Sequence, residues 1–299
     1  MKRTTRPSPD ALATWGRAIL ARQLERIREA TPGALAGRDS ECVHDLRVAI
    51  RRARHALKLF PVFHADVRCH ALRGELGRAF KALGAVRDHD VLISTLGSLC
   101  GHVHAAASTR TALDSALSML RDKAVQPMLA ALRSAAYRDA VADLSAMAGR
   151  GPACPADDAV RSFAAQAVSS VLKKTCAWRE QAGRSDAAAH LHALRIALRR
   201  LRYTCEFFAD VYGGAMKKAI QCCVELQEIL GSHQDACVAT QLLEAAAASF
   251  AGRSKVLLTC GALIQMQREK EAGCHRAFAR EWVKFPGRMS RRLKQCSGL

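Results

Sequence analysis

The strongest constraint on the fold is a stretch of sequence that occurs twice. The first copy starts at Val43 and reads VHDLRVAIRRARHALKLF, and the second starts at Leu191 and reads LHALRIALRRLRYTCEFF. A second matching pair follows at nearly the same spacing, LGAVRDHD over 83–90 and LGSHQDAC over 230–237. Two stretches that recur in the same order predict a duplicated structural unit rather than an array of short repeats.

Both copies have the period of an amphipathic α-helix, which places the cationic residues of each copy on one side. The first basic rail consists of His44, Arg47, Arg51, Arg54 and Lys58. The second basic rail consists of His192, Arg195, Arg199 and Arg202. An apolar stripe lies on the other side of each helix, from Leu46 to Phe60 and from Leu194 to Phe208. We therefore expect each helix to pack by its apolar side and to present its rail.

The crowded rails lack a nearby counter-charge. Like charges three or four residues apart on a helix each cost about 0.2–0.5 kcal/mol. Only the end of the second rail carries an acid, because Glu206 stands where the first copy has Lys58, and we expect it to form an internal ion pair. A bound polyanion would relieve the repulsion. The alternative is a solvated face, or pairing with acidic residues from neighbouring helices.

Helix-forming residues dominate almost the whole chain, and no stretch alternates with the period of a strand, so we predict an all-α fold. The expected helices cover about 9–30, 39–60, 64–84, 87–99, 106–148, 156–182, 186–212, 214–231, 234–250 and 254–282, with a basic tail after Pro286. A break at GRGPACP (149–155) divides the chain into a first unit, 1–150, and a second unit, 151–299.

The repeated Leu-Gly-x-x-x-Asp element reads as a helix stop followed by a helix start. Gly84 and Gly231 can adopt the left-handed turn that ends a helix. Asp88 and Asp235 can then cap the next helix. We expect both aspartates to be structural.

The overall charge favours a polyanionic partner. The net charge is +19, and there are about three arginines for each lysine. Arginine offers a planar fork to phosphate oxygens and stays charged at physiological pH. The helices that follow the rails add further cations, namely Arg73, Lys81, Lys217 and Lys218. We expect His44 and His192 to donate hydrogen bonds to phosphate.

The cysteines and the N-terminus indicate a cytoplasmic protein. Twelve cysteines are scattered through the chain without a C-x-x-C pair, mostly in apolar helical stretches, which is typical of reduced thiols used for packing. The N-terminus lacks the apolar segment of a secretion signal, and no stretch is long and apolar enough to span a membrane. We expect no membrane partner.

Signatures of nucleotide and metal chemistry are absent from the sequence. There is no G-x-x-x-x-G-K-[ST] loop, no G-x-G-x-x-G and no H-E-x-x-H. Cys100, His102 and His104 could supply metal ligands, but alternate residues of a helix point apart, so we expect a helix-end loop there. No nucleophile accompanies His44 or His192 at a recognisable spacing. We predict no cofactor, no metal and no enzymatic activity.

The motifs in both halves resemble those of the CHAD family, the conserved histidine α-helical domain. The resemblance spans about residues 10–285 and makes the two units parts of one domain. It implies two four-helix-bundle-like halves related by a pseudo-two-fold axis, with basic residues lining a central groove or pore. It also implies binding of inorganic polyphosphate and association with polyphosphate granules. Gln234 and Glu206 replace Arg87 and Lys58 of the first half, which makes the second half less basic.

Two other functions stay open at this point. A non-specific nucleic-acid binder would also be strongly basic, although the rails carry few aromatic or amide side chains to stack or read bases, so no specific nucleic acid is expected. A hydrolase of polyphosphate or phosphate esters could use His44 or His192. It would lose phosphate release, but only part of its binding, when those histidines are replaced.

Overall fold

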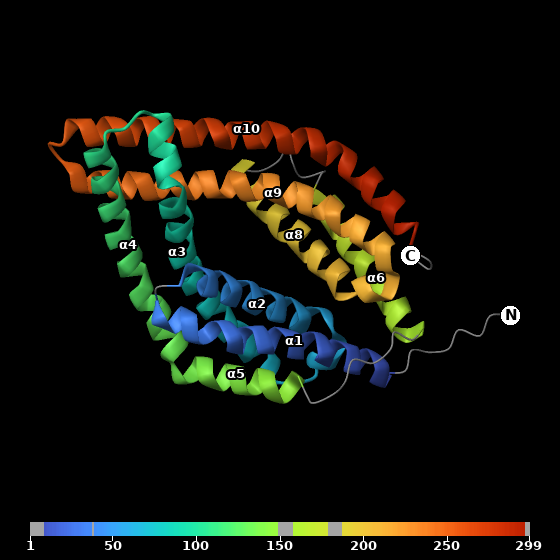
Figure 1. Ribbon diagram of the computed structural model, residues 1–299. Helices are drawn as coiled ribbons and strands as arrows, with labels where there is room; N and C mark the ends of the chain where they lie inside the picture. The colour runs from blue at the N-terminus through green and yellow to red at the C-terminus, as the bar shows by residue number, and fades with distance from the viewer. Residues whose placement is uncertain (1–8, 38, 149–157, 179–186, 297–299) are drawn as a thin grey trace.

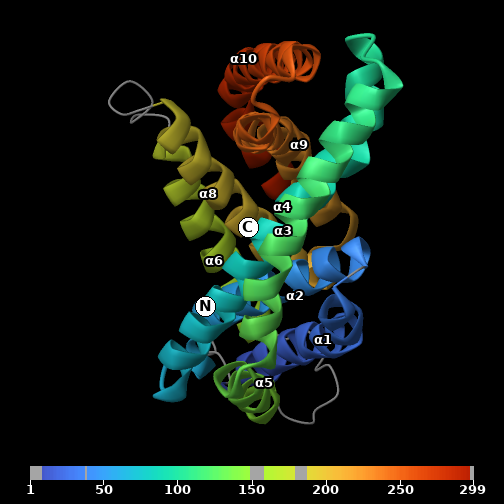
Figure 2. The same ribbon diagram turned by 90° about the vertical axis from the view of Figure 1, so that its left-hand side faces the viewer.

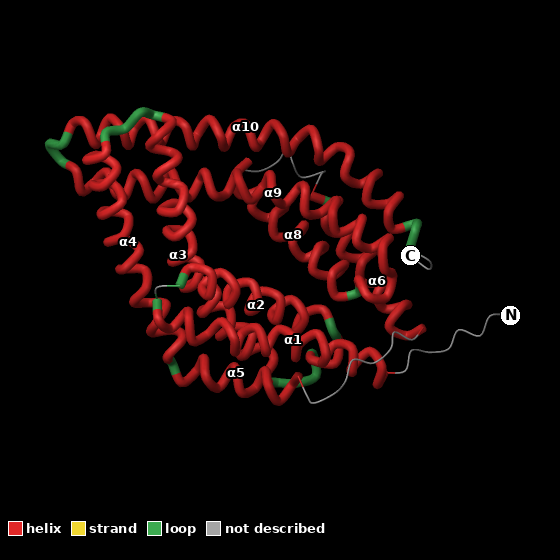
Figure 3. The backbone as a smooth tube through the Cα atoms, viewed as in Figure 1, coloured by secondary structure: helices red, strands yellow, loops and turns green. Residues whose placement is uncertain are grey.

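The computed structural model describes residues 9–37, 39–148, 158–178 and 187–296, and these fold into helices joined by short loops. The predicted break at 149–155 lies outside the described residues. Figure 3 shows helices and loops and no strand in the described part, which confirms the all-α prediction. The α-helices are α1 (Pro9–Ala36), α2 (Ser40–Leu59), α3 (Arg68–His102), α4 (Ala107–Arg133), α5 (Ala135–Ala148), α6 (Asp158–Cys176), α8 (Ala187–Phe207), α9 (Ala209–Ala247) and α10 (Ser254–Leu293). Short 3₁₀ helices cover Pro61–Phe63 and Ala248–Phe250.

The helices form two groups that two long helices connect. Figure 1 shows α1, α2 and α5 together at the bottom, and α6, α8, α9 and α10 together above them. The helices α3 and α4 run between the two groups, and the view at right angles shows the same arrangement (Figure 2). The helix α2 of the first group contacts α8 of the second.

Three clusters of buried apolar residues hold these helices together. The first lies among α1, α2, α5 and the first half of α3, with residues of α4, α6 and α8 at its edges, and the second lies among α6, α8, the start of α9 and the end of α10. The third joins the groups, because it draws on the second half of α3, the start of α4, the end of α9 and the start of α10. The apolar stripes predicted for α2 and α8 are confirmed, since Leu46, Ile50, Leu194 and Leu198 are all buried.

The prediction that the two Leu-Gly elements end helices is wrong. The helix α3 continues through Gly84, and α9 continues through Gly231. A glycine within a helix costs only about 1 kcal/mol relative to alanine, which tertiary packing readily offsets. Asp88 and Asp235 therefore lie inside long helices and cap nothing, and the expected pairs 64–84 with 87–99 and 214–231 with 234–250 are each one helix.

The structure refines the prediction at three other places. The helical segment 106–148, which the sequence leaves open as one helix or two, is two helices that meet at Ser134, whose hydroxyl accepts a hydrogen bond from the Tyr137 N–H. The helix boundary predicted at 213 coincides with a kink in α9, because Gly213 has non-helical dihedral angles with a positive φ of 56° that suits glycine. The chain also turns at Phe208, where α8 ends and α9 begins. The helix α10 continues past Pro286, because Phe285 and Met289 are buried in the second cluster.

Candidate functional site

The two basic rails meet where α2 packs against α8. Asp39 fixes the start of α2, since its carboxylate accepts hydrogen bonds from the N–H groups of Glu41 and Cys42 at 2.9 and 3.0 Å. At the contact, Tyr203 of α8 is buried, with 1% of its surface exposed. The guanidinium carbon of Arg51 lies 5.5 Å from the centre of the Tyr203 ring, and that of Arg52 lies 5.1 Å away. Tyr203 thus serves as a cation–π platform between the rails.

A cavity of about 240 Å³ opens between α2, α3 and α8. Five of the predicted site residues line it: Arg51, Arg54, Lys58, Arg73 and Arg199. The other residues described along its wall are His55, Phe80, Ile196, Arg200 and Tyr203. The wall of this cavity therefore combines cations from both copies of the repeated stretch, and none of these ten residues is acidic.

The helix α3 holds the first rail in position. The Arg54 Nε donates a hydrogen bond to the Arg73 carbonyl at 3.2 Å, and the Arg47 guanidinium lies over the Phe80 ring at 4.4 Å. Glycines on the same helix make room for these side chains. A Cβ on Gly77 would lie 3.0 Å from the Arg54 Nη2, and a Cβ on Gly84 would lie 3.2 Å from Arg47. Close approach of a guanidinium is therefore the physical reason for Gly84.

This contact predicts that Gly84→Ala and Gly231→Ala differ in their effects. A Cβ on Gly231 meets no atom within 4 Å, so that variant should gain about 0.5–1 kcal/mol of unfolding free energy from helix propensity. In Gly84→Ala, displacement of Arg47 should cancel most of the gain. Urea denaturation of both variants measures the difference. Equal stabilisation by the two substitutions would show that Gly84 makes no room for Arg47.

Burial and mutual repulsion leave the central arginines poorly compensated. Burial, and then the charges of Arg51 and Arg195, lower the pKa of Arg199 to about 9. Burial and the charge of Arg51 lower the pKa of Arg47 to about 10. Both values lie above neutral pH, so both side chains remain charged at pH 7. The rails thus hold charge at an energetic cost that an anion in the cavity would reduce.

Several cations also repel one another at the Lys58 end of the cavity. The charge of Arg200 lowers the pKa of Lys58, followed by burial and by the charges of Arg73 and Lys174. Burial and the charges of Arg73 and Arg200 likewise lower the pKa of Arg54. Lys174 brings in a further helix, α6. This end of the site is a cluster of cations from four helices.

Carboxylates lie at the opposite end of the rails. Asp88 of α3 and Asp235 of α9 line a second cavity of about 260 Å³. Burial raises the pKa of Asp88, while the charge of Arg47 opposes the rise and the nearby Asp235 adds to it. Asp235 and Asp88 also act on Arg195. The two aspartates that were predicted to be helix caps therefore lie near Arg47 of the first rail and Arg195 of the second.

Glu206 forms the expected ion pair, and it does so with two arginines. Its carboxylate lies 2.6 Å from the Arg52 Nη1 and 3.3 Å from the Arg202 Nε. The side chains of Arg52 and Glu206 are only 19% and 20% exposed. Arg202, a predicted ligand, is therefore occupied by an internal partner and does not line the 240 Å³ cavity.

The two predicted histidines lie on the rails but do not line this cavity. His44 is partly buried, and burial and the charge of Arg87 lower its pKa. The His192 Nδ1 lies 3.2 Å from the amide oxygen of Gln234. Gln234 thus occupies the position in the second half that Arg87 occupies in the first. Gln234 contacts His192, and the charge of Arg87 acts on His44.

A third histidine, His55, does line the cavity, and sequence reasoning missed it. Its Nε2 lies 3.0 Å from the Thr204 hydroxyl, which itself donates to the Arg200 carbonyl at 2.9 Å. The Thr204 oxygen is therefore left to accept the Nε2–H of a neutral ring. Burial, followed by the charge of Arg200, lowers the pKa of His55 from 6.5 to about 4.

The lowered pKa of His55 predicts a loss of stability in acid. Between about pH 6.5 and pH 4 His55 is protonated in the unfolded chain but not in the folded chain. The free energy of unfolding therefore decreases as the pH is lowered through this range. The full window is worth about 3 kcal/mol. We expect His55→Phe, which retains a ring beside Tyr203 and Phe207, to show a shallower fall between pH 7 and pH 4.5 by urea denaturation. Superimposable pH profiles for the variant and the parent would contradict this assignment.

Some predicted site residues do not line the cavity, and some residues that line it were not predicted. Lys81, Lys217 and Lys218 are exposed and do not line the cavity. Arg200 and Tyr203 line it and were missed as site residues. Arg200 could have been found, because it matches Arg52 in the repeated stretch. The metal candidates at the end of α3 do not gather: the His102 Nδ1 lies 2.7 Å from the Ser98 carbonyl oxygen, and Cys100 is buried.

The chain is thus an all-α protein in which two arginine-rich helices lie on opposite sides of a cavity. The CHAD domain family model matches residues 18–244, and the chain belongs to the CHAD family. The CHAD domain from the plant Ricinus communis is a similar solved structure, with 28% identity, a TM-score of 0.71, and coverage of 90% of this chain and 91% of that one. PptA from Streptomyces chartreusis shares the fold at 20% identity and a TM-score of 0.69, over 93% of this chain and 100% of that one. No curated protein matches the sequence.

None of the helices in the described part of the chain is both long and apolar enough to cross a membrane.

Proposed function

We propose that the chain binds inorganic polyphosphate in the 240 Å³ cavity between α2, α3 and α8. The observation that carries the proposal is the cavity wall itself, where Arg51, Arg54, Lys58, Arg73, Arg199 and Arg200 converge and no described wall residue is acidic. Membership of the CHAD family supports the same ligand, because the family resemblance implies polyphosphate binding. The binding would place the protein on cytoplasmic polyphosphate granules.

A flexible chain of phosphates fits the chemistry of this site. Each phosphate unit offers oxygens to planar guanidiniums, and repeated identical units need no reading of sequence. The cation cluster around Lys58 would hold one stretch of the chain, and the arginines around Tyr203 would hold the next. A nucleic-acid duplex is the alternative ligand. It is disfavoured because its phosphates lie on a wide, stiff helix that cannot enter a small cavity.

Binding without hydrolysis is part of the proposal. The alternative function as a hydrolase would use His44 or His192. Neither histidine lines the cavity, and His192 contacts Gln234 instead. The one histidine on the wall, His55, is engaged by Thr204 and surrounded by cations, which oppose its protonation. A general acid or base needs a pKa near the working pH. A pKa of about 4 does not suit His55 to that role at neutral pH.

The test is isothermal titration calorimetry with long-chain polyphosphate at several salt concentrations. If about five phosphates are neutralised, log K should fall with log salt with a slope of about −3 to −5. The double variant Lys58→Ala/Arg73→Ala should weaken binding at least tenfold and flatten the slope. The matched control is Lys217→Ala/Lys218→Ala, which removes the same charge from outside the cavity. Equal losses in both double variants would mean that overall charge, and not this cavity, binds the ligand.

A further inference from the structure

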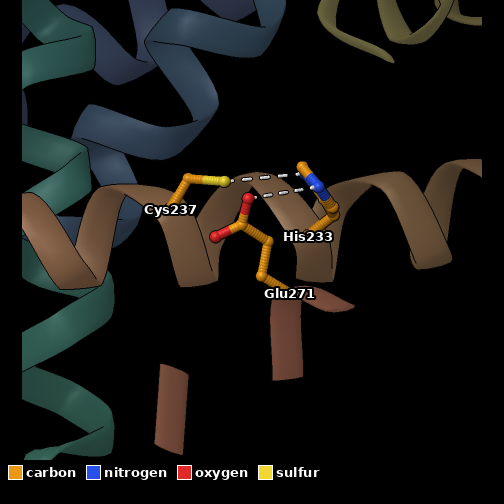
Figure 4. A group of neighbouring side chains, drawn as sticks. All are labelled: His233, Cys237 and Glu271. Atoms are coloured by element: carbon orange, nitrogen blue, oxygen red, sulfur yellow. Dashed lines mark hydrogen bonds and ion pairs between the residues drawn. The ribbon is translucent and has the colours of Figure 1, made fainter. Parts of the chain in front are cut away.

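A second cluster of side chains with binding potential lies where α9 packs on α10. His233 and Cys237 are one turn apart on α9, and Glu271 reaches them from α10 (Figure 4). His233 is buried, and Cys237 and Glu271 are partly buried. The cluster is separate from the cavity wall of the rails, and no step of polyphosphate binding uses it.

The three side chains lie close to the spacing of a small tetrahedral metal site. The Cys237 Sγ lies 3.6 Å from the His233 Nδ1, and the Glu271 Oε1 lies 3.6 Å from the His233 Nε2. One ligand atom from each residue lies within 4.8 Å of the others. Metal–ligand lengths of about 2.0–2.3 Å at tetrahedral angles give ligand-to-ligand separations of roughly 3.3–3.6 Å. The Cys237 thiol and the Glu271 carboxylate approach different nitrogens of the His233 ring, and only one of these can bind a given metal. To close the site, one of these two side chains must therefore move toward the nitrogen that the other contacts.

Two further potential donors follow Glu271 on α10. Cys274 and His275 follow Glu271 by three and four residues on α10, so they share its side of the helix. Neither belongs to the group of three whose ligand atoms lie within 4.8 Å of one another, so the cluster supplies three protein ligands and leaves the fourth position of a tetrahedral metal open.

A reactive Cys–His pair is the main alternative for this geometry. A nucleophilic cysteine needs a lowered pKa, from a cationic neighbour or a helix N-terminus. Cys237 instead lies far from the N-terminus of α9, and the Glu271 carboxylate lies beside it in the same cluster. The carboxylate beside the thiol thus opposes a free thiolate. A divalent cation between the two groups would stabilise both anions at once.

We propose that His233, Cys237 and Glu271 bind a zinc-type divalent transition metal that clamps α9 to α10. Sulfur and imidazole ligands favour Zn²⁺ or Co²⁺ over Mg²⁺ or Ca²⁺, which prefer oxygen. Gln234 and Asp235 lie on α9 between the two α9 ligands, and Gln234 contacts His192 of the second rail. The metal therefore fixes the segment of α9 that contacts His192, the first residue of the second rail.

The test uses the full chain, stripped with a chelator and kept reduced, and titrated with Co²⁺ without polyphosphate. We expect one Co²⁺ per chain, a thiolate-to-cobalt charge-transfer band and the strong visible bands of tetrahedral cobalt, all displaced by Zn²⁺. Cys237→Ser should abolish the charge-transfer band. His233→Gln should lower the affinity for zinc at least about tenfold, because the loss of a residue that only supports a metal ligand already costs about that much. The control His102→Ala/His104→Ala removes exposed imidazole from the other histidine cluster and should change neither.

Circular dichroism of each apo variant shows that it is folded before titration. The absence of the charge-transfer band in the folded parent protein would overturn the proposal. So would a band that survives Cys237→Ser, or that disappears in the His102→Ala/His104→Ala control. Because polyphosphate is absent from the titration, its outcome is independent of the polyphosphate assignment.

Discussion

Arg199→Met is expected to make the ligand-free protein more stable and its binding of polyphosphate weaker. Arg199 is repelled by Arg51, Arg195 and Arg47, and burial adds to the cost of its charge. A buried charge without a partner is expensive, and an apolar side chain of similar length removes that expense. We expect the free energy of unfolding to rise by about 1–3 kcal/mol. Loss of a charge-assisted contact should weaken polyphosphate binding at least tenfold.

Two measurements on one variant test this prediction. Urea denaturation without ligand gives the change in stability, and calorimetry gives the change in affinity. Arg276→Met on α10 is the matched control, because Arg276 is exposed and a surface substitution changes stability by less than about 0.5 kcal/mol. Destabilisation of Arg199→Met with unchanged affinity would show that Arg199 is a structural residue with a partner within the protein.

Glu206→Gln is expected to have the opposite pair of effects. Glu206 compensates Arg52 and Arg202, and the Arg52 pair is largely shielded from water. Removing one partner of such a pair leaves an uncompensated charge, so the free energy of unfolding should fall by about 2–4 kcal/mol. The two released guanidiniums also increase the positive charge beside Tyr203, so polyphosphate should bind more tightly, several-fold at low salt.

Glu244→Gln provides the matched control for this substitution. Glu244 lies 3.1 Å from Arg268, and both side chains are at least half exposed, so the loss should stay within about 1 kcal/mol. Chemical denaturation of both variants compares the shielded pair with the exposed one. Similar losses in the two variants, with no gain in polyphosphate affinity for Glu206→Gln, would contradict the role given to Glu206.

Helical periodicity predicted the parts of the site that depend on one helix at a time. The grouping of Arg47, Arg51 and Arg54 on one side of α2, and the burial of Leu46 and Ile50 on the other, follow directly from the spacing of the residues. The ion pair of Glu206 was predicted from the break in the second rail.

The parts that depend on how helices meet could not be predicted in this way. Gly84 looked like a helix stop because its role, leaving space for Arg47, exists only once α2 and α3 are packed. Asp88 and Asp235 looked like caps for the same reason. The sequence also gives no means of telling Lys58, which lines the cavity, from Lys217, which does not. That distinction is set by tertiary contacts alone.

The central claim is that the opposed rails form a site for polyphosphate, and thermal melting tests it most directly. The protein is melted with long-chain polyphosphate and with duplex DNA at equal phosphate concentration, beside the double variant Arg51→Ala/Arg199→Ala. A ligand at a thousandfold excess over its Kd stabilises the folded state by about 4 kcal/mol. We predict a large rise in Tm with polyphosphate, a much smaller rise with DNA, and loss of most of the polyphosphate effect in the double variant. Equal rises with both polyanions, undiminished in the double variant, would contradict the account.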